Sequence, residues 1–363
     1  MNKRYLITGG AGFIGSNVAH HYLAQGARVT IVDDFSRQGS RDNAAWLQGE
    51  HGRAVTVVEA DVSRAKRSLV QLVDRADVVF HLAAQVAVTT SVTDPRRDFE
   101  VNALGTFNVV EACRRSSSNP VLIYASTNKV YGEMTHMEVV KSGNRYAYAD
   151  LPQGVGEGMG LDFHSPYGCS KGTGDQYVID YARIYGMRTV VFRQSCIYGP
   201  HQFGMEDQGW VAWFALRGLM NQPVTIFGDG CQVRDVLHVH DLIRAYEAAI
   251  ERIDKVSGQA FNIGGGPQNT MSLLELLDML EAQLGKPVEH SFADWRPGDQ
   301  RIYVSNIAKA RERLGWEPRL GPLAGVQQLI DWLADNKDRV SFAKGALKLM
   351  PHHAPASRRH AIG

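Results

Sequence analysis

The 363-residue chain lacks the features that mark several protein classes. Its four cysteines, at positions 113, 169, 196 and 231, are scattered without the spacing of a metal site or a disulfide framework, so we expect reduced thiols. Lysine and arginine (39) barely outnumber aspartate and glutamate (38), which argues against a nucleic-acid coat or a membrane-surface protein. No apolar run approaches the roughly 18 residues that a membrane span needs. With 44% hydrophobic residues, the chain can instead bury a sizeable core.

The N-terminal segment also lacks the pattern of a secretory signal. Its basic start reaches Gly9 after a short apolar run at 5–7, which is too brief for the apolar region of a signal peptide. We therefore expect a cytoplasmic protein. The length of the chain favours one large α/β domain with a second lobe.

The first half of the chain alternates short apolar runs with amphipathic stretches. The runs that predict strands lie at 5–8, 28–33, 55–59, 77–82, 121–126 and 189–193. Amphipathic stretches such as 13–25 and 98–115 lie between them. Because the strand runs are apolar throughout rather than alternating, helices should cover both faces of the sheet. This order predicts a Rossmann-type doubly wound parallel sheet, in which ligands bind at the carboxyl ends of the strands.

This order ends after about Tyr198, where we predict a smaller C-terminal lobe. The patterns beyond it are a helix at 208–219, a strand and helix over 235–249, a strand at 260–263, and helices at 272–284, 307–314 and 325–335. The predicted division is a Rossmann domain at 1–193 and a second lobe at 194–340 that returns some segments to the main sheet. Residues 341–363 lack a periodic apolar face, so we expect a flexible tail.

A glycine-rich loop follows the first predicted strand and opens the first helix. Gly9, Gly12 and Gly15 have G-x-x-G-x-x-G spacing, a variant of the dinucleotide-binding fingerprint. The helix N-terminus would offer free N–H groups and a positive dipole to phosphates. Asp33 ends the second strand 18 residues after Gly15, where its carboxylate would accept ribose hydroxyls and repel a 2′-phosphate. The loop and Asp33 together predict NAD rather than NADP.

Three side chains form the predicted catalytic group. Tyr167 and Lys171 stand one helical turn apart and would share a face of the helix. A neighbouring ammonium and a nicotinamide cation would favour the phenolate of a group whose ordinary pKa is about 10, and so make it a base near neutral pH. Thr127 closes a buried-looking strand at its carboxyl end, where its hydroxyl would hold a substrate hydroxyl beside Tyr167.

With these motifs, the chain resembles the extended short-chain dehydrogenase/reductases that act on nucleotide sugars, over about residues 4–335. The resemblance also rests on Asp61 after the third strand, the segment 81–84 and Asn102. It implies that Asp61 and Val62 contact adenine, and that Lys171 also holds the nicotinamide ribose. The NAD-binding residues that it implies are Gly9, Gly12, Phe13, Ile14, Gly15, Asp33, Asp61, Val62, Leu82, Ala83, Ala84, Asn102, Tyr167 and Lys171.

The same resemblance implies that the second lobe mainly binds a nucleotide sugar. Arg234 and Arg296 match positions that grip the diphosphate, a task that suits the forked guanidinium. The full set of implied substrate contacts is Thr127, Asn128, Ser195, Gln208, Arg234 and Arg296. The resemblance further implies a dimer or tetramer. From the balanced charge we expect no nucleic-acid or membrane partner. We also expect no metal, because the histidine pairs at 20–21, 238/240 and 352–353 fall on an ordinary helix, a strand-loop and the tail.

The residues after Thr127 indicate which reaction to expect. Dehydratases of this family carry an Asp-Glu pair there, whereas this chain has Asn128 and Lys129, so dehydration is not expected. The stretches 126–132, 162–172, 207–211 and 232–237 resemble epimerases that act at C2 of CDP-linked hexoses. We therefore expect an NAD-dependent isomerase that oxidises C2 transiently and returns the hydride to the opposite face. The alternatives are a UDP- or dTDP-sugar 4-epimerase or reductase and, more remotely, a catalytically silent NAD-binding protein.

Overall fold

The computed structural model describes residues 3–296 and 299–342. Within these residues the main sheet has seven parallel strands in the order β12-β8-β5-β4-β1-β2-β3. The strands are β1 (Arg4–Thr8), β2 (Arg28–Asp33), β3 (Val55–Glu59), β4 (Val78–His81), β5 (Val121–Thr127), β8 (Thr189–Gln194) and β12 (Gln259–Ile263). The order reverses between β1 and β4, which places the ligand crevice of a doubly wound sheet above these two strands. The predicted fold class is confirmed.

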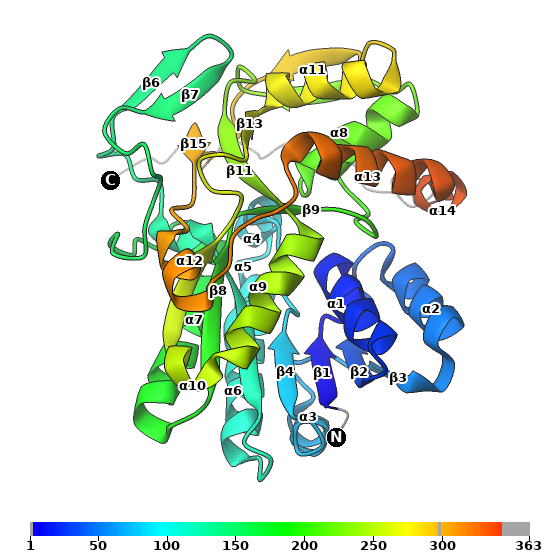
Figure 1. Cartoon of the computed structure of the whole chain (residues 1–363), viewed down its shortest axis with the longest axis vertical. Coiled ribbons are helices and arrows are strands. Elements are labelled where there is room, and N and C mark those ends of the chain that lie inside the picture. The colour runs from blue at the N-terminus through cyan, green and yellow to red at the C-terminus, as the bar shows by residue number, and fades with distance from the viewer. Residues whose placement is uncertain (1–2, 297–298, 343–363) are drawn as a thin grey trace, which may run out of the picture.

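Helices cover both faces of this sheet (Figure 1). One face is covered by α1 (Phe13–Ala24), α2 (Ser40–His51), α9 (Val239–Glu251), α10 (Ile253–Val256) and α12 (Ala308–Leu314). The other face is covered by α3 (Lys66–Val73), α6 (Gly105–Arg115) and α7 (Ser165–Tyr185). The short helices α4 (Val88–Thr93) and α5 (Pro95–Phe99) and a π-helical turn (Glu100–Leu104) lead into α6. Both faces are therefore buried, as the apolar strands predict.

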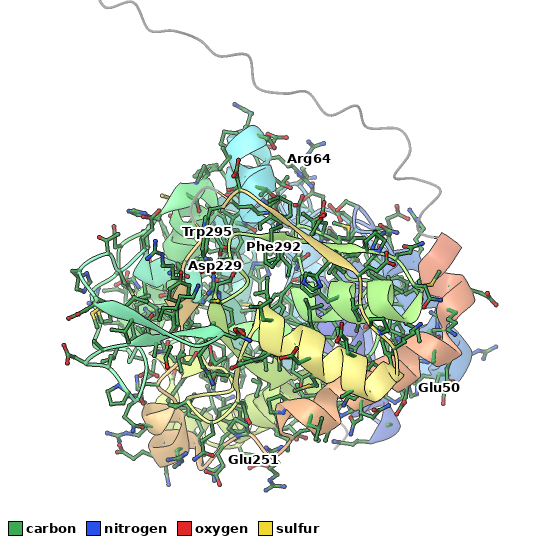
Figure 2. The ribbon with its side chains drawn as sticks, turned by 90° about the horizontal axis from the view of Figure 1, so that it is seen from above. Glu50, Arg64, Asp229, Glu251, Phe292 and Trp295 are labelled. Carbon is green, nitrogen blue, oxygen red and sulfur yellow. The ribbon has the colours of Figure 1, made fainter. Side chains whose placement is uncertain are left out.

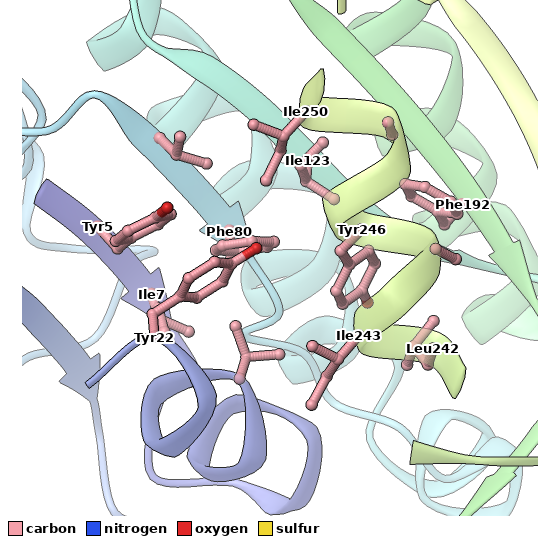
Figure 3. Packing of buried hydrophobic residues seen from close by; sticks show 14 of the residues in the cluster. Tyr5, Ile7, Tyr22, Phe80, Ile123, Phe192, Leu242, Ile243, Tyr246 and Ile250 are labelled. Atoms are coloured by element: carbon pink, nitrogen blue, oxygen red, sulfur yellow. The ribbon is translucent and has the colours of Figure 1, made fainter. Parts of the chain in front are cut away.

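Aromatic side chains fill much of the core between the sheet, α1 and α9 (Figure 3). Tyr5 of β1 and Tyr22 of α1 stack with their ring centroids 3.9 Å apart. Phe80 of β4 lies 5.3 Å from the ring of Tyr246 on α9, which in turn contacts Phe192 of β8 at 5.1 Å. Because α9 comes from the second half of the chain, this core joins the two halves.

The second lobe lies above the carboxyl ends of the main strands (Figure 1). Its strands are β9 (Cys196–Tyr198), β11 (Val233–His238), β13 (Thr270–Ser272) and β15 (Ile302–Tyr303) in one sheet, β10 (Val224–Phe227) with β14 (His290–Ala293), and the hairpin of β6 (Val139–Ser142) with β7 (Arg145–Tyr148). Its helices are α8 (Trp210–Leu219), α11 (Leu273–Leu284), α13 (Pro322–Asp335) and α14 (Lys337–Phe342). The first three helices pack around a second apolar core, so the lobe has an interior of its own.

The structure bears on the predicted division of the chain. β12 joins the main sheet beside β8, and α9 packs on that sheet, so segments of the second half do return to the first. The boundary at 193/194 stays a prediction. Of the predicted tail, 341–342 end α14, and the rest, with the histidine pair at 352–353, lies outside the described residues. In the part of the chain that the structure describes, no helix is long and apolar enough to cross a membrane, and no group of three or more metal-ligating side chains occurs.

Candidate active site

A cavity of about 430 Å³ lies at the carboxyl ends of the main strands. The glycine loop, the ends of β2 to β5 and one turn of α7 form its wall. The predicted cofactor residues in that wall are Gly9, Gly12, Phe13, Ile14, Gly15, Asp33, Asp61, Val62, Leu82, Ala83, Ala84, Tyr167 and Lys171. The fold thus brings together residues that are spread over more than 160 positions of the sequence.

The glycine loop packs too closely for side chains at Gly9, Gly10 and Gly15. Gly9 has φ +69°, and a Cβ there would lie 2.6 Å from the amide nitrogen of Ala83. A Cβ at Gly15 would lie 2.1 Å from the carbonyl oxygen of Gly9. Gly12 is the N-cap of α1 and has no side chain with which to cap the helix. The first N–H groups of α1 are therefore available to phosphate oxygens, so the loop fits a dinucleotide.

Asp33, at the end of β2, is held in place by backbone amides. Its Oδ2 accepts a hydrogen bond from the Ala11 N–H at 3.0 Å, and its Oδ1 accepts one from the Phe35 N–H at 2.9 Å. Burial raises the pKa of Asp33, and these N–H groups act in the opposite direction. The carboxylate is thus fixed in the cavity wall with lone pairs to spare for ribose hydroxyls.

The three predicted catalytic side chains meet where β5 faces α7. Burial raises the pKa of Tyr167 to about 12, although a hydrogen bond with Thr127 acts to lower it. Burial lowers the pKa of Lys171 to about 7. The Lys171 ammonium donates to the carbonyl oxygen of Ala125 at 2.5 Å and lies 4.4 Å from the ring centroid of Tyr124. Desolvation has the largest influence on the pKa of both groups, and the activation of Tyr167 by Lys171 and a nicotinamide cation stays a prediction.

The structure places Asn102 behind the cavity wall. Asn102 lies in the π-helical turn, where its side chain donates to the Gln85 carbonyl at 2.9 Å and to Ser170 Oγ at 3.2 Å. Its Oδ1 accepts from the Gln85 N–H at 2.9 Å. Asn102 therefore fixes the loop after β4 against α7, next to Lys171.

A buried histidine supports the base of the cavity. His81 closes β4, where its Nδ1 lies 2.7 Å from Thr8 Oγ1 and its Nε2 lies 2.9 Å from Thr106 Oγ1. Burial lowers the pKa of His81 to about 3. The ring is thus neutral at physiological pH and joins β1, β4 and α6 directly below the glycine loop.

On the substrate side, Arg234 of β11 is paired within the protein. Its guanidinium contacts Asp299 Oδ1 at 2.8 Å and the carbonyl oxygen of Gln300 at 2.7 Å. A phosphate would have to share or replace the Asp299 contact, because a guanidinium has a fixed number of donors.

Arg296 lies in the segment after β14 and is stacked on an aromatic ring. Its guanidinium is centred 3.8 Å from the ring centroid of Phe227 and lies 3.3 Å from Asp207. The neighbouring Trp295 covers Gly228, where a Cβ would approach the indole to 2.7 Å. Trp295 lies on the outer surface of the lobe (Figure 2). Arg296 is thus held at the rim of the second lobe. In the sequence it lies far from Arg234.

The two residues after Thr127 offer amide and ammonium groups. Thr127 Oγ1 lies 3.3 Å from the side-chain oxygen of Asn128. The Lys129 ammonium donates to Gln300 Oε1 at 3.0 Å. Burial lowers the pKa of Lys129 to about 8, and the charge of Arg234 adds to this effect. The pair therefore contains no carboxyl group, although a lysine with this pKa can exchange a proton near neutral pH.

Ser195 and Gln208, both predicted substrate contacts, are engaged by other protein groups. The Ser195 hydroxyl donates to the carbonyl oxygen of Asp235 at 3.1 Å and also contacts the Asp235 carboxylate. Gln208 lies in the wall of the cofactor cavity, where its side-chain oxygen accepts a hydrogen bond from Arg37. Gln208 therefore lies where the second lobe meets the cofactor side.

Sequence reasoning missed several residues of the cavity wall. These are Asp34, Arg37, Gln85, Arg97 and Gln194. Asp34 directly follows Asp33, and that adjacency could have signalled it. Arg97 lies in a polar stretch with no motif, and only the fold brings it to the cavity.

The chain is similar to known epimerases along most of its length. Residues 5–264 match the sequence profile of the NAD dependent epimerase/dehydratase family. CDP-paratose 2-epimerase of Salmonella typhi is 45% identical over 336 residues, which cover 91% of this chain and 98% of that protein. The structure of UDP-glucose 4-epimerase of Thermotoga maritima with UDP-glucose has a TM-score of 0.79 at 32% identity, covering 92% of this chain and 99% of that one.

A second solved structure contains the predicted cofactor. UDP-glucose 4-epimerase of Thermus thermophilus in complex with NAD has a TM-score of 0.76 at 32% identity, over 91% of this chain and 99% of that one. The family match and these similarities confirm the predictions of the NAD cofactor and of epimerase activity. The chain belongs to the NAD-dependent epimerase/dehydratase family and is an NAD-dependent nucleotide-sugar epimerase.

Proposed function

We propose that the enzyme inverts C2 of a CDP-linked hexose, most specifically a dideoxyhexose of the paratose/tyvelose type, as CDP-paratose 2-epimerase (CDP-tyvelose epimerase) does by name. The observation that carries this proposal is the similarity to that enzyme, 45% identity over 91% of the chain. The pair Asn128 and Lys129, beside the Tyr167–Thr127 contact, supports it because it replaces the Asp-Glu pair of the dehydratases.

The catalytic group would act on the C2 hydroxyl. Bound NAD supplies the uptake and return of a hydride at the sugar carbon. Tyr167 takes the hydroxyl proton as the C–H bond at C2 breaks, and gives it back when that bond forms again on the opposite face. Thr127, which shares a hydrogen bond with Tyr167, orients the sugar oxygen. Lys171 lines the cavity, and its ammonium is held against β5 by the carbonyl oxygen of Ala125.

Inversion requires the sugar to turn between the two steps. The 2-keto sugar has to present its other face, so the nucleotide must stay bound while the ring rotates. Arg234 and Arg296 would hold the diphosphate during this rotation, because guanidinium groups pair with phosphate oxygens in a fixed geometry. A site anchored on the diphosphate leaves the sugar free to rotate about the linking bonds.

A deuterium label at C2 tests the proposed chemistry. We would incubate the enzyme with a CDP-hexose deuterated at C2 in ordinary water and analyse the product by NMR. Transfer of the same hydride away and back predicts that the label stays at C2 of the epimer. Loss of the label to solvent would show deprotonation of the C–H bond, and inversion at C4 alone would show a 4-epimerase; either result contradicts the proposal.

A matched panel of substrates tests the proposed nucleotide independently of the carbon atom that is inverted. The same sugar linked to CDP, UDP or dTDP would be offered to the enzyme at equal concentrations. We expect the highest kcat/KM for the CDP sugar. A preference for UDP or dTDP with inversion at C2 would overturn the proposed nucleotide and leave the proposed chemistry intact.

We further propose that the enzyme is a homo-oligomer, a dimer or tetramer. Apolar side chains that are each at least a third exposed lie on the outer side of α6 and α7, and patches of this kind often mark subunit interfaces. They are Phe107, Tyr177, Ile184 and Tyr185. Light scattering should give a mass of two or four chains in wild type and a smaller mass in Ile184→Glu. A single-chain mass in wild type would contradict the proposal.

The cytoplasm is the compartment that we propose. The thiols of Cys113, Cys169, Cys196 and Cys231 are unpaired in the structure, which is typical of proteins in a reducing compartment. Cell fractionation followed by detection of the enzyme would test this location, and recovery from an extracellular fraction would contradict it.

A further inference from the structure

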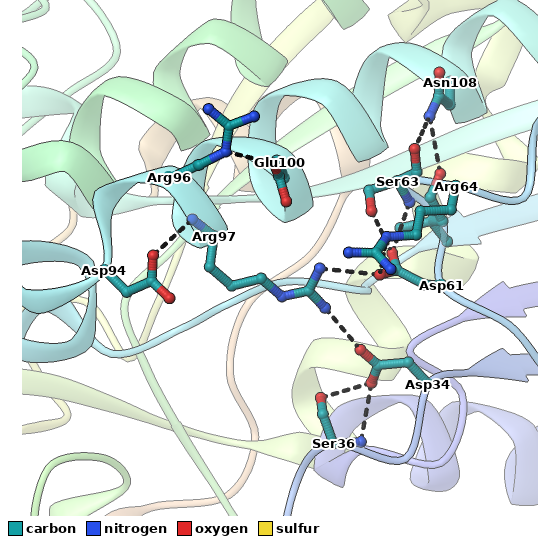
Figure 4. Close-up of polar contacts among 11 residues, drawn as sticks. Asp34, Ser36, Asp61, Ser63, Arg64, Asp94, Arg96, Arg97, Glu100 and Asn108 are labelled. Carbon is teal, nitrogen blue, oxygen red and sulfur yellow. Dashed lines mark hydrogen bonds and ion pairs between the residues drawn. The ribbon is translucent and has the colours of Figure 1, made fainter.

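One guanidinium joins the ends of two neighbouring strands at the edge of the cofactor cavity (Figure 4). Arg97 of α5 places Nη1 at 2.9 Å from Asp61 Oδ2 and Nη2 at 3.1 Å from Asp34 Oδ2. Asp34 follows β2 and Asp61 follows β3, and all three side chains line the cavity. The two ion pairs therefore span the gap between adjacent strand ends.

Each carboxylate of this bridge is fixed independently of the arginine. Asp34 Oδ1 accepts hydrogen bonds from the backbone N–H of Ser36 at 3.0 Å and from its hydroxyl at 2.6 Å. Asp61 Oδ1 accepts the equivalent pair from Ser63 at 2.8 and 2.6 Å. Burial raises the pKa of Asp61, but the bonds from Ser63 and Arg97 outweigh it and hold the pKa below its usual range. The arginine thus meets two carboxylates already in position.

The arginine is also anchored at its backbone. Asp94 is the N-cap of α5, and its Oδ1 accepts a hydrogen bond from the Arg97 N–H at 3.0 Å. The guanidinium can bond both carboxylates at once because its N–H groups diverge in a rigid fork. Its charge is engaged by Asp34 and Asp61, so it does not offer a 2′-phosphate the free cation that NADP would need.

The position of the bridge relates it to one end of NAD. Asp33 faces the ribose position of the dinucleotide fold, and the glycine loop faces the phosphates. Asp34 and Asp61 lie beside Asp33 at the outer strands of this half of the sheet, at the adenosine end. The side chains of Arg97, Asp34 and Asp61 are between a fifth and a third exposed, so the bridge is a partly exposed part of the cavity wall.

We propose that Arg97 is a positioning residue that closes the adenosine end of the cavity and slows the release of NAD. This inference rests on the NAD cofactor and deepens the proposed function. An epimerase that returns its hydride must keep the reduced cofactor bound until the keto sugar has rotated to present its other face. Without Arg97, Asp34 and Asp61 would repel each other, and the wall would open on that side.

The test measures cofactor retention rather than turnover. Wild type, Arg97→Leu and Arg96→Leu would be loaded with NAD and passed repeatedly through gel filtration, and the nicotinamide nucleotide per chain would be measured by chromatography. Arg96 is the matched control because it is the preceding residue of the same helix, is 89% exposed and pairs with Glu100 at 3.1 Å on the solvent side. We expect Arg97→Leu to lose NAD about five- to tenfold faster, from ion pairs of this exposure, and Arg96→Leu to match wild type.

Two further variants keep the test decisive if Arg97→Leu folds poorly. Arg97→Lys keeps the charge without the fork, and Asp34→Asn removes one of the two ion pairs without shortening the side chain. Both should lose NAD faster than wild type and more slowly than Arg97→Leu. Salt should speed release from wild type at about 0.5 M and have less effect on the variants, because these partly exposed pairs are screened. Retention equal to wild type in both conservative variants would overturn the inference.

The outcome is independent of the substrate proposal. Retention is measured without a nucleotide sugar, so an enzyme that fails to invert C2 can still show faster loss of NAD in Arg97→Leu. Conversely, an active C2 epimerase in which Arg97→Leu and Arg97→Lys retain NAD as wild type does would overturn only the role of Arg97.

Discussion

The cofactor side and the substrate side of this enzyme hold their charged groups in different ways. On the cofactor side, Asp33 is fixed by the N–H groups of Ala11, in the neighbouring glycine loop, and of Phe35, two residues further along the chain. On the substrate side, Arg234 is fixed by Asp299, which lies 65 positions further along the chain. The carboxylate of the cofactor side is therefore held by loops next to its own strand, whereas the guanidinium of the substrate side is held by a distant segment.

This difference has a consequence for binding. The start of α1 after Gly12 offers backbone donors without a capping side chain, so a dinucleotide gains its contacts there directly. Arg234 and Arg296 are engaged by carboxylates, and a diphosphate gains only the difference between two ionic contacts. We expect NAD to stay bound through many cycles, while the nucleotide sugar binds and leaves in each one.

The catalytic group lies where the two sides meet, and its loss should have the largest effect. Tyr167→Phe should lower kcat by about two to four orders of magnitude, the usual weight of acid–base catalysis. NAD should remain bound, because the glycine loop is untouched. Thr127→Ala should lose less, since Thr127 positions the hydroxyl and transfers no proton. Steady-state rates and the amount of bound NAD, measured in parallel for each variant, check this prediction. Near-normal turnover in Tyr167→Phe would contradict the role of Tyr167 as the base.

A methyl group in the glycine loop should break the cofactor side alone. Gly15→Ala places a Cβ 2.1 Å from the carbonyl oxygen of Gly9, so α1 has to shift away from β1. We expect a loss of about 3 kcal/mol in the free energy of unfolding and loss of copurifying NAD. Urea unfolding and cofactor analysis measure both.

Gly49→Ala is the control for that substitution. Gly49 lies in α2, and an added Cβ would meet nothing within 4 Å. Alanine there should stabilise the protein by about 1 kcal/mol, the usual difference in helix propensity. Equal stability of the two variants would mean that the close approach of Gly15 to Gly9 is unimportant.

Acid should weaken the cofactor side through His81. Its pKa is about 3 in the folded protein, where burial disfavours the charged ring, and about 6.5 when unfolded. The unfolded chain thus binds more protons between pH 6.5 and 3, so stability falls as the pH falls through this window. At pH 5 the loss from His81 is about 2 kcal/mol. His81→Gln should flatten the pH dependence measured by urea unfolding, and the exposed His136→Gln should leave it as in wild type; an unchanged slope in His81→Gln would contradict this account.

The smallest effect is expected on the substrate side. Arg234→Gln should raise KM for the nucleotide sugar about tenfold, which corresponds to about 1.4 kcal/mol, and leave the bound NAD in place. The effect is moderate because the substitution also removes the competing contact with Asp299. Arg313→Gln, at an exposed pair with Glu312, is the control. A loss of NAD in Arg234→Gln would show that the two sides are not separable in this way.

The sequence predicts the cofactor side well because its signals are local. The glycine spacing, Asp33 and the turn from Tyr167 to Lys171 each depend on a few consecutive residues. The glycine loop follows an apolar strand and Asp33 ends another. The place of Asn102 behind the wall could not be predicted, because the π-helical turn sets its direction. The raised pKa of Tyr167 could not be predicted either, because it results from burial, which the spacing of residues in the sequence does not show.

The substrate side is harder to predict for a physical reason. Its strands β13 and β15 have only three and two residues, too few for a period to be recognised. The contact of Gln208 with Arg37, and that of Arg234 with Asp299, join segments that share no local pattern. Such contacts arise only when the whole chain has folded.

The position of β12 links the synthesis of the two halves. β8 ends at Gln194, but β12, which covers its edge, begins only at Gln259, and α9, which covers the face beside it, lies between them. A nascent chain that has reached the end of β8 therefore carries an unpaired strand edge and an open apolar surface, the kind of surface that invites aggregation. The ribosome has to deliver the chain as far as Ile263 before the main sheet can be completed. The cofactor and the nucleotide sugar bind mainly to different lobes, yet the two lobes complete their folding together.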